Sequence, residues 1–291
     1  PEAPFPHGWR RSCALTIDSS KIDADLTDWT MILTEDSLPA EMFDADGEYP
    51  AQEGGGDIRF SSDSQGVNRL ACDIRVFHLD DHNMGAGADI AVKIPLVSSA
   101  RDTTIYVWYN CPQGASQPAA DSAWGQYNAY DSSFEGVWPE GGGADRTGNQ
   151  NNGTENGGVS TGASAGTVDS ATQFDALDDF FRVTDDPSMD LSAVTVSTLV
   201  NPDTVDKGGM CMLSKRTGNN ASYIFRFSYG VGVFSGRDRI LFGFDRRDLG
   251  GEAANFESDF TMTTNSWQYI AATHTYGAPG NTRLYKNGSA G

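Results

Sequence analysis

Two patterns in the sequence have the residue types of a catalytic site. The segment Gly162-Ala-Ser-Ala-Gly166 has the letters of a nucleophile elbow, in which a strand-to-helix turn exposes a reactive serine. Here the letters lie in a Gly/Ser/Ala tract with no strong strand before them and no helix after them, so we interpret them as coincidence.

Glycoside hydrolysis needs two carboxyl groups about 5–9.5 Å apart. Beyond residue 136 the glutamates lie in loop-like contexts, so we predict no catalytic residue and no enzyme; they are Glu140, Glu155, Glu252 and Glu257.

The histidines and cysteines show no spacing typical of a metal site. His78 and His82 flank two aspartates, but along a strand they lie too far apart to share one ion, so we expect a solvated hairpin tip. His274 lies on the apolar face of an alternating segment, which predicts a packed or interface histidine. The four cysteines lack any CxxC pair, and we expect buried free thiols, with a Cys13–Cys72 bridge as the alternative.

Aromatic side chains are the remaining candidates for ligand binding, because sugar rings stack on their faces. They occur in and beside residues 113–135 and in a Gly/Pro-rich loop near the C-terminus, where packing between domains is an equal alternative. The candidate ligand-binding residues are Trp124, Tyr127, Tyr130 and Tyr276.

The charge of the chain excludes one large class of partner. The 291 residues include 40 Asp and Glu against 20 Lys and Arg, a formal net charge of −20. Nucleic-acid binding needs clustered basic residues, so we expect no nucleic-acid partner. We also expect no membrane insertion, because no apolar run approaches the ~18 residues of a membrane span. The first six residues lack the basic and apolar parts of a signal peptide, so we expect cytoplasmic synthesis; a leader already removed is the alternative.

Alternation with period two dominates the sequence and predicts the elements that position these residues. Ile90, Val92 and Ile94 share one face of a strand, and Ile105 and Val107 share another. Asp- and Gly-rich turns separate such runs, and no stretch of 12 or more residues keeps a helical period. The predicted fold is all-β, with two antiparallel β-sandwiches.

The chain divides, by its composition, into two predicted domains. We expect an N-terminal β-sandwich over 1–112 that serves as scaffold or attachment, a connector over 113–135, and a second sandwich over 136–291. Residues 141–169 are rich in Gly, Asn, Thr and Ser, which is typical of a flexible linker or of a long ordered loop with one short strand around Val159.

Five segments of the first predicted domain form a recognisable set: 9–17, 56–60, 70–74, 91–95 and 104–110. On these segments, about a hundred residues of the chain resemble an uncharacterised sandwich domain of bacterial surface proteins and phage structural proteins. The usual turn after the last strand contains a glycine, whereas this chain reads Trp108-Tyr-Asn-Cys111, so the local turn is expected to differ.

Five segments characterise the second predicted domain: Phe134-Glu-Gly-Val-Trp138, 170–175, 178–183, 267–273 and the hairpin 283–288, whose Asn287-Gly288 turn requires positive φ. On these segments, the domain resembles a laminin-G-like, concanavalin A-like jelly roll. Further strands normally follow in that family, so we expect a jelly roll without its C-terminal strands; completion of the sheet by a neighbouring subunit is the alternative.

These two resemblances together imply a function and a cofactor. Concanavalin A-like domains often bind calcium through loop carboxylates, which makes calcium the candidate cofactor. The competing interpretation is that these aspartates are solvated loop residues. The candidate ligands are Asp175, Asp178, Asp179, Asp185 and Asp186.

The domain pair resembles the N-terminal part of a phage tail fibre or related virion appendage. The implied partners are other virion proteins or copies of the chain in a homo-oligomer such as a trimer, with a lectin-like domain for host-surface glycans. The alternatives are a secreted adhesin or cell-surface carbohydrate-binding protein and, more remotely, a glycan-active hydrolase.

Overall fold

The computed structural model confirms the all-β prediction. It describes residues 5–81, 85–139, 142–167, 169–205, 210–217, 220–228, 238–245, 253–276 and 282–291. In these ranges the only helices are short 3₁₀ turns: Ser19–Lys21, Glu35–Ser37, Ala40–Met42, Glu53–Gly55, Gln126–Asn128 and Pro187–Met189. None of the described helices is long and apolar enough to cross a membrane. The chain forms two compact units, Pro1–Ser188 and Met189–Gly291.

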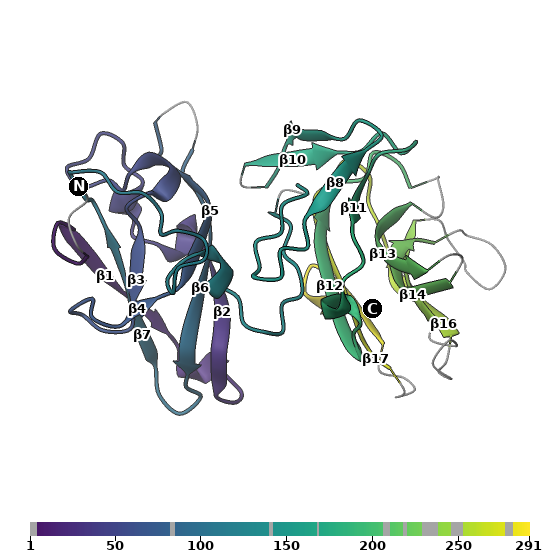
Figure 1. The fold of residues 1–291 in the computed structure, drawn as a ribbon, viewed down its shortest axis with the longest axis horizontal. Helices are drawn as coiled ribbons and strands as arrows, with labels where there is room; N and C mark the ends of the chain where they lie inside the picture. Colours follow the sequence, from purple (N-terminus) through teal and green to yellow (C-terminus); the bar gives the residue numbers. More distant parts are fainter. Residues whose placement is uncertain are drawn as a thin grey trace. The chain divides into compact units, whose positions relative to one another are not determined.

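The first unit begins with a sandwich of two antiparallel sheets (Figure 1). One sheet has the order β1-β7-β3-β4, formed by Arg11–Ile17, Thr103–Tyr109, Arg59–Ser61 and Arg69–Leu70. The other has the order β2-β6-β5, formed by Leu26–Thr34, Gly87–Val97 and Cys72–His78.

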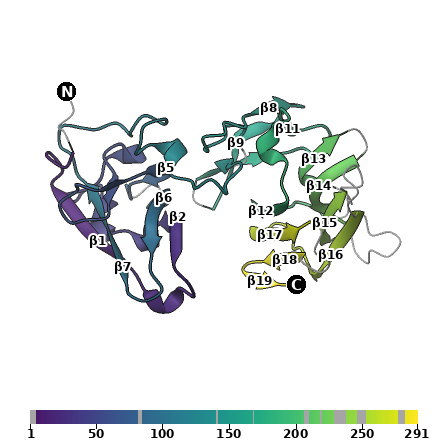
Figure 2. The ribbon, with the colours of Figure 1, turned by 60° about the horizontal axis from the view of Figure 1, so that its bottom comes forward.

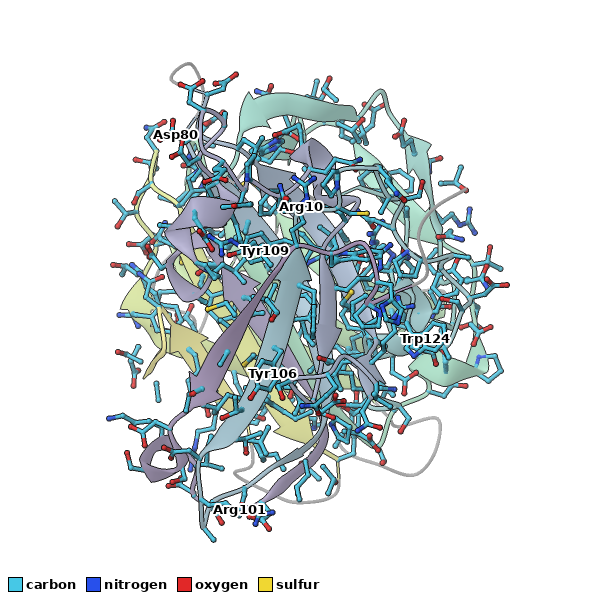
Figure 3. The ribbon with its side chains drawn as sticks, turned by 90° about the vertical axis from the view of Figure 1, so that its left-hand side faces the viewer. Arg10, Asp80, Arg101, Tyr106, Tyr109 and Trp124 are labelled. Atoms are coloured by element: carbon cyan, nitrogen blue, oxygen red, sulfur yellow. The ribbon has the colours of Figure 1, made fainter. Side chains whose placement is uncertain are left out.

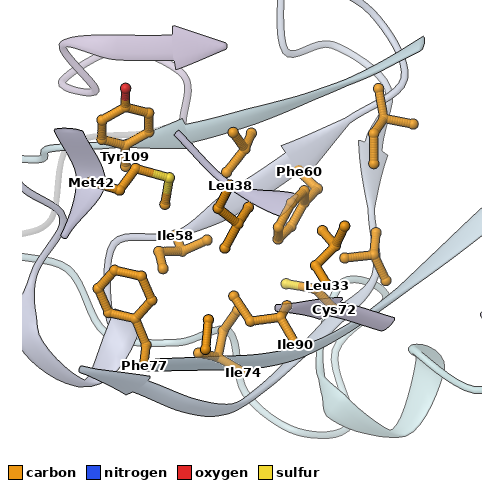
Figure 4. Packing of buried hydrophobic residues seen from close by; sticks show 14 of the residues in the cluster. Leu33, Leu38, Met42, Ile58, Phe60, Cys72, Ile74, Phe77, Ile90 and Tyr109 are labelled. Carbon is orange, nitrogen blue, oxygen red and sulfur yellow. The ribbon is translucent and has the colours of Figure 1, made fainter. Parts of the chain in front are cut away.

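The core of this sandwich lies between its two sheets (Figure 4). Ile90, Val92 and Ile94 of β6 are fully or almost fully buried, as their alternation predicts, and Ile105 and Val107 of β7 are buried too. Residues on both sheets therefore share one apolar cluster, and its burial drives the sheets together.

All four cysteines are free, as expected. Cys72 packs in the core of the first sandwich, where burial raises the pKa of its thiol to about 12. Cys111 is also buried and Cys13 is half-buried, but Cys211 is exposed, so the expected burial is wrong for that residue.

Between β7 and the next strand, residues 110–152 contain no strand in the part that the structure describes. Buried carboxylates order this segment instead. Asp145 accepts hydrogen bonds from the backbone of Val137 (2.9 Å), Thr147 (3.0 Å) and Asn151 (2.8 Å), and from the Thr147 hydroxyl (2.8 Å). Of the two interpretations of residues 141–169, the structure favours the ordered loop, because the Asp145 carboxylate satisfies donors of Thr147 and Asn151 within that stretch and of Val137 before it.

A second buried carboxylate joins the 110–152 segment to the first sandwich. Asp73 of β5 accepts a hydrogen bond from the Tyr130 hydroxyl (2.7 Å) and pairs with two nitrogens of the Arg146 guanidinium. The Thr30 hydroxyl of β2 donates to the Ala129 carbonyl (2.9 Å), and Ala129 and Tyr130 pack against Ala91. The outer face of this sheet is therefore covered by a segment without strands.

The first unit ends in two small antiparallel ribbons rather than one short strand around Val159. Strand β8 (Gly153–Asn156) pairs with β11 (Phe180–Val183), and β9 (Ser160–Ala165) pairs with β10 (Ser170–Gln173). The Gly-x-Ser-x-Gly letters begin inside β9 and lead to a second strand, so a strand-to-helix elbow is absent from this described region.

The second unit is a sandwich of two four-stranded antiparallel sheets (Figure 2). The first has the order β12-β17-β18-β19, formed by Ala193–Val200, Gln268–Thr275, Arg283–Lys286 and Ser289–Ala290. The second follows chain order, β13 to β16, formed by Cys211–Thr217, Asn220–Phe227, Arg239–Asp245 and Ala253–Thr261. Aromatic residues of β14 and β15 fill the core against Ile270 and Ala272 of β17. The domain boundaries expected at residues 112 and 136 stay a prediction.

The Asp145 network gives a stability prediction. Replacing Asp145 by Asn removes two acceptor positions and leaves buried donors unpaired. We expect Asp145→Asn to lower the free energy of unfolding of the first unit by about 2–4 kcal/mol, since hydrogen bonds to charged groups contribute about 1.5–3 kcal/mol each. Urea unfolding measures the change, with the exposed Asp121→Asn as the matched control. Equal stability of the two variants would contradict the role of Asp145.

Candidate functional site

Three of the predicted calcium ligands come together in the loop between β10 and β11. One carboxylate oxygen from each of Asp175, Asp178 and Asp179 lies within 4.8 Å of the others. The Asp175 amide donates to the Asp179 carboxylate (2.8 Å), and the Leu177 amide donates to the Asp175 carboxylate (2.7 Å). These bonds bend the loop, in which Ala176 has a φ of 62°. We call residues 174–180 the acidic loop.

A glycine outside the acidic loop lets it approach the neighbouring ribbon. Gly157 follows β8 and has a φ of 81°. A Cβ at this position would lie 2.3 Å from the Asp178 carbonyl oxygen and 2.7 Å from the Asp179 amide nitrogen. Only glycine fits both the conformation and the contact without displacing the loop. The neighbouring Gly158 has a φ of 107°, but nothing lies within 4 Å of its Cβ position.

The other two predicted ligands, Asp185 and Asp186, follow β11 and do not join this group in the described residues. The Asp186 carboxylate accepts a hydrogen bond from the Ser188 amide (2.9 Å) at the short helix Pro187–Met189. Calcium takes six to eight oxygen ligands, and carboxylates, backbone carbonyls and water all serve. The three grouped aspartates have the right donor chemistry for such an ion and supply part of its shell.

Exposed apolar side chains surround these carboxylates. Leu177 at the tip of the acidic loop is 81% exposed, and Phe174 and Phe180 at its two ends are also exposed. The Phe174 ring packs edge-on against Phe181 (6.1 Å between centroids). These phenylalanines were not among the predicted ligand-binding residues, which are Trp and Tyr. Their position on both sides of an Asp-rich turn was the sequence feature that could have indicated a binding surface.

The four predicted ligand-binding aromatics lie in different surroundings. Trp124 is 41% exposed, with the Arg69 guanidinium 4.2 Å from the centre of its ring; Figure 3 shows it beside the sheet that contains β1 and β7. Tyr127 is half-buried. Tyr130 is buried, and this burial together with Asp73 raises the pKa of its hydroxyl. Tyr276 packs edge-on against Phe244 and is partly buried in the core of the second unit.

His274 is a packed histidine, as predicted. Its ring stacks on Phe244 with 3.8 Å between centroids, and Nδ1 lies 2.9 Å from the Thr282 hydroxyl. Burial lowers the pKa of this imidazole. The ring therefore stays neutral in the folded protein at neutral pH.

His78 has the opposite environment. Its Nδ1 lies 2.9 Å from a carboxylate oxygen of Glu53, and its Nε2 lies 3.6 Å from one of Asp169. The hydrogen bond to Glu53 is the largest cause of its raised pKa, and the charge of Asp169 adds to it. Protonated His78 thus joins the first sandwich to the loop between β9 and β10. His82, the other end of the expected hairpin tip, lies outside the described residues, as do Glu140 and Glu252.

Two of the glutamates expected in loops lie in strands. Glu155 is in β8 and Glu257 is in β16, where its carboxylate accepts a hydrogen bond from the Ser228 hydroxyl (2.6 Å). The expectation of loop positions is therefore wrong for both. Around Glu155, the Gly- and Asn-rich flanks obscured the strand signal.

One part of the chain is similar to a known protein family. Residues 174–290 match the model of the concanavalin A-like lectin/glucanases superfamily, a laminin-G type. The match begins at the acidic loop and covers less than half of the chain. No curated protein matches the sequence. One similar solved structure, from Bacteroides ovatus, is a protein to which carbohydrate binding is provisionally assigned. It is 13% identical with a TM-score of 0.28, and the alignment covers 92% of this chain but only 65% of that one.

The two histidines give a prediction about pH. Because the folded pKa of His78 is raised, its stabilisation is complete below its unfolded pKa of about 6.5 and is lost as pH rises through the folded value. Because the folded pKa of His274 is lowered, its contribution is complete above about 6.5 and is lost as pH falls through the folded value. NMR titration of the two imidazoles should therefore bracket the ordinary histidine pKa from opposite sides.

His78→Gln should remove the high-pH loss of stability in the first unit and leave the low-pH loss in the second unit unchanged. The measurement is amide exchange of each unit between pH 5 and 8. Identical pH profiles for His78→Gln and the unaltered chain would contradict the assignment.

Proposed function

We propose that this chain is a non-enzymatic carbohydrate-binding protein whose segment 174–290 provides the glycan-binding surface. The observation that carries the proposal is the match of this segment to a superfamily of lectins and glucanases. The acidic loop at the start of the segment presents carboxylates beside exposed Phe174 and Phe180. Sugar hydroxyls bind carboxylates and cations, and sugar rings stack on aromatic faces.

Binding rather than hydrolysis is favoured by the environment of the grouped acids. A glycosidase needs one carboxylic acid kept protonated near neutral pH, and burial in an apolar pocket is a common way to achieve this. Asp175 and Asp178 are exposed and Asp179 is only partly buried. These aspartates suit an ion or sugar hydroxyls better than general acid catalysis.

The proposal includes calcium at Asp175, Asp178 and Asp179. Three carboxylates close together repel one another, and a divalent cation would relieve this repulsion and fix the loop. A fixed loop presents Phe174, Leu177 and Phe180 in one arrangement and so lowers the entropy lost on glycan binding.

We further propose that the protein is located in a virion, as the N-terminal part of a phage tail fibre or similar appendage. The first sandwich would attach to other virion proteins or to copies of the chain, and the segment 174–290 would contact host glycans. Support comes from the resemblance of the first sandwich to a domain found in phage structural proteins. Because that domain also occurs in bacterial surface proteins, a cell-surface carbohydrate-binding protein is the second candidate.

A glycan array with the whole chain tests the binding function. We expect binding in calcium and at least tenfold weaker binding in EDTA. Asp178→Asn and Gly157→Ala should weaken calcium-dependent binding at least tenfold, the first by removing a ligand and the second by displacing the loop. Asp203→Asn and Gly158→Ala are matched controls, since Asp203 is outside the group and Gly158 shares the positive φ without the close contact. Absence of binding with and without EDTA would reject the glycan function.

Antibody labelling of particles and cells tests the location. We expect label on a tail appendage of purified phage particles. Label confined to the surface of uninfected bacteria would replace the virion assignment by the second candidate.

A further inference from the structure

A small cavity lies where the 110–152 segment meets the first sandwich. Its volume is about 190 Å³, and its described lining consists of Arg75 of β5 with Pro139, Gly142, Ala144 and Arg146. Two guanidinium groups and no acidic side chain therefore line it among the described residues. Each of these guanidinium groups forms an ion pair with one carboxylate, Arg75 with Asp89 and Arg146 with Asp73, so the cavity presents hydrogen-bond donors rather than an excess of positive charge.

An ion pair with a carboxylate holds each of the two guanidinium groups in place. Arg146 donates from Nε to Asp73 (3.1 Å) and pairs with the same carboxylate through Nη2. The Asp73 carboxylate is fully buried. Arg75 pairs through Nη2 with Asp89 of the neighbouring strand, and its side chain is only 11% exposed. Because an ion pair already holds each guanidinium group, a ligand has less rotamer freedom to restrict when it binds.

Arg75 keeps an unused donor. Its Nε is buried and has no hydrogen-bond partner among the described residues. A buried donor without an acceptor costs free energy, which an acceptor bound in the cavity would recover. A guanidinium presents its donors in a planar fork that matches the two oxygens of a carboxylate.

We propose that this cavity binds the carboxylate of a single sugar acid. The carboxylate is assigned from the two guanidinium groups and the unpaired Nε. The size follows from the volume, which is below the roughly 300–1,000 Å³ of pockets for drug-sized ligands and so admits one small ring. The sugar part of the assignment rests on the proposed glycan function, whereas the carboxylate part does not.

The site is made of residues outside the segment 174–290, so it can be tested separately from the lectin-like function. The probes are D-glucuronate, D-glucose and acetate, titrated into the whole chain. Saturable shifts of the Arg75 Nε–H signal in ¹⁵N NMR report occupancy.

We expect D-glucuronate to shift this signal saturably and D-glucose to leave it unchanged. Arg75→Lys keeps the charge and the partner Asp89 but removes Nε, and calorimetry should show at least tenfold weaker glucuronate binding. Ala144→Phe should have the same effect by filling the cavity, and because Ala144 is exposed the larger side chain does not disturb the core. The control Arg11→Gln removes a partly exposed pair with Glu41 and should bind like the unaltered chain.

Three results would overturn the proposal. Absence of saturable glucuronate binding rejects the site, and equal binding of glucose rejects carboxylate recognition. Acetate binding as tight as glucuronate rejects the sugar assignment. If glycan-array binding is retained in Arg75→Lys, a failed glucuronate titration rejects only the cavity proposal and leaves the glycan-binding function in place.

Discussion

The first unit depends on one constraint: the Asp73 carboxylate lies inside the protein and has to be paired there. A buried, unpaired carboxylate would be strongly destabilising, so Tyr130 and Arg146 must stay in place. Both partners belong to the 110–152 segment, which has no strand of its own in the described residues. Asp145, next to Arg146, then orders the part of the segment from Val137 to Asn151. Hydrogen bonds to two carboxylates thus order this segment in place of the backbone hydrogen bonds that order a sheet. The segment is followed in the chain by the ribbons that carry the acidic loop.

Much of the fold was predictable because burial on one face of a strand produces alternation. Ile90, Val92, Ile94 and the packed His274 followed from that period. The pairing of Asp73 was not predictable, because an aspartate on the outer face of a strand usually points to water, and its partners lie 57 and 73 residues away in sequence. The ordered conformation of the Gly- and Asn-rich stretch was not predictable either, because hydrogen bonds to one carboxylate leave no periodic pattern in the sequence.

The candidate site was predictable in composition but not in geometry. Five aspartates were expected to gather, and three do. What selects Asp175, Asp178 and Asp179 is the bend at Ala176 and the close passage of Gly157, and neither is evident from the order of residues. Tyr130 illustrates the converse: its type suited a sugar ring, but its hydroxyl is bonded to Asp73 and its ring is buried.

The central claim is that buried carboxylates, rather than strands, order the 110–152 segment on the first sandwich. Hydrogen exchange of the amides that donate to Asp145, those of Val137, Thr147 and Asn151, tests it most directly. The account predicts that these three amides exchange slowly, with protection similar to the amides of β6. Exchange of all three at the rate of an unstructured chain, with β6 still protected, would contradict it.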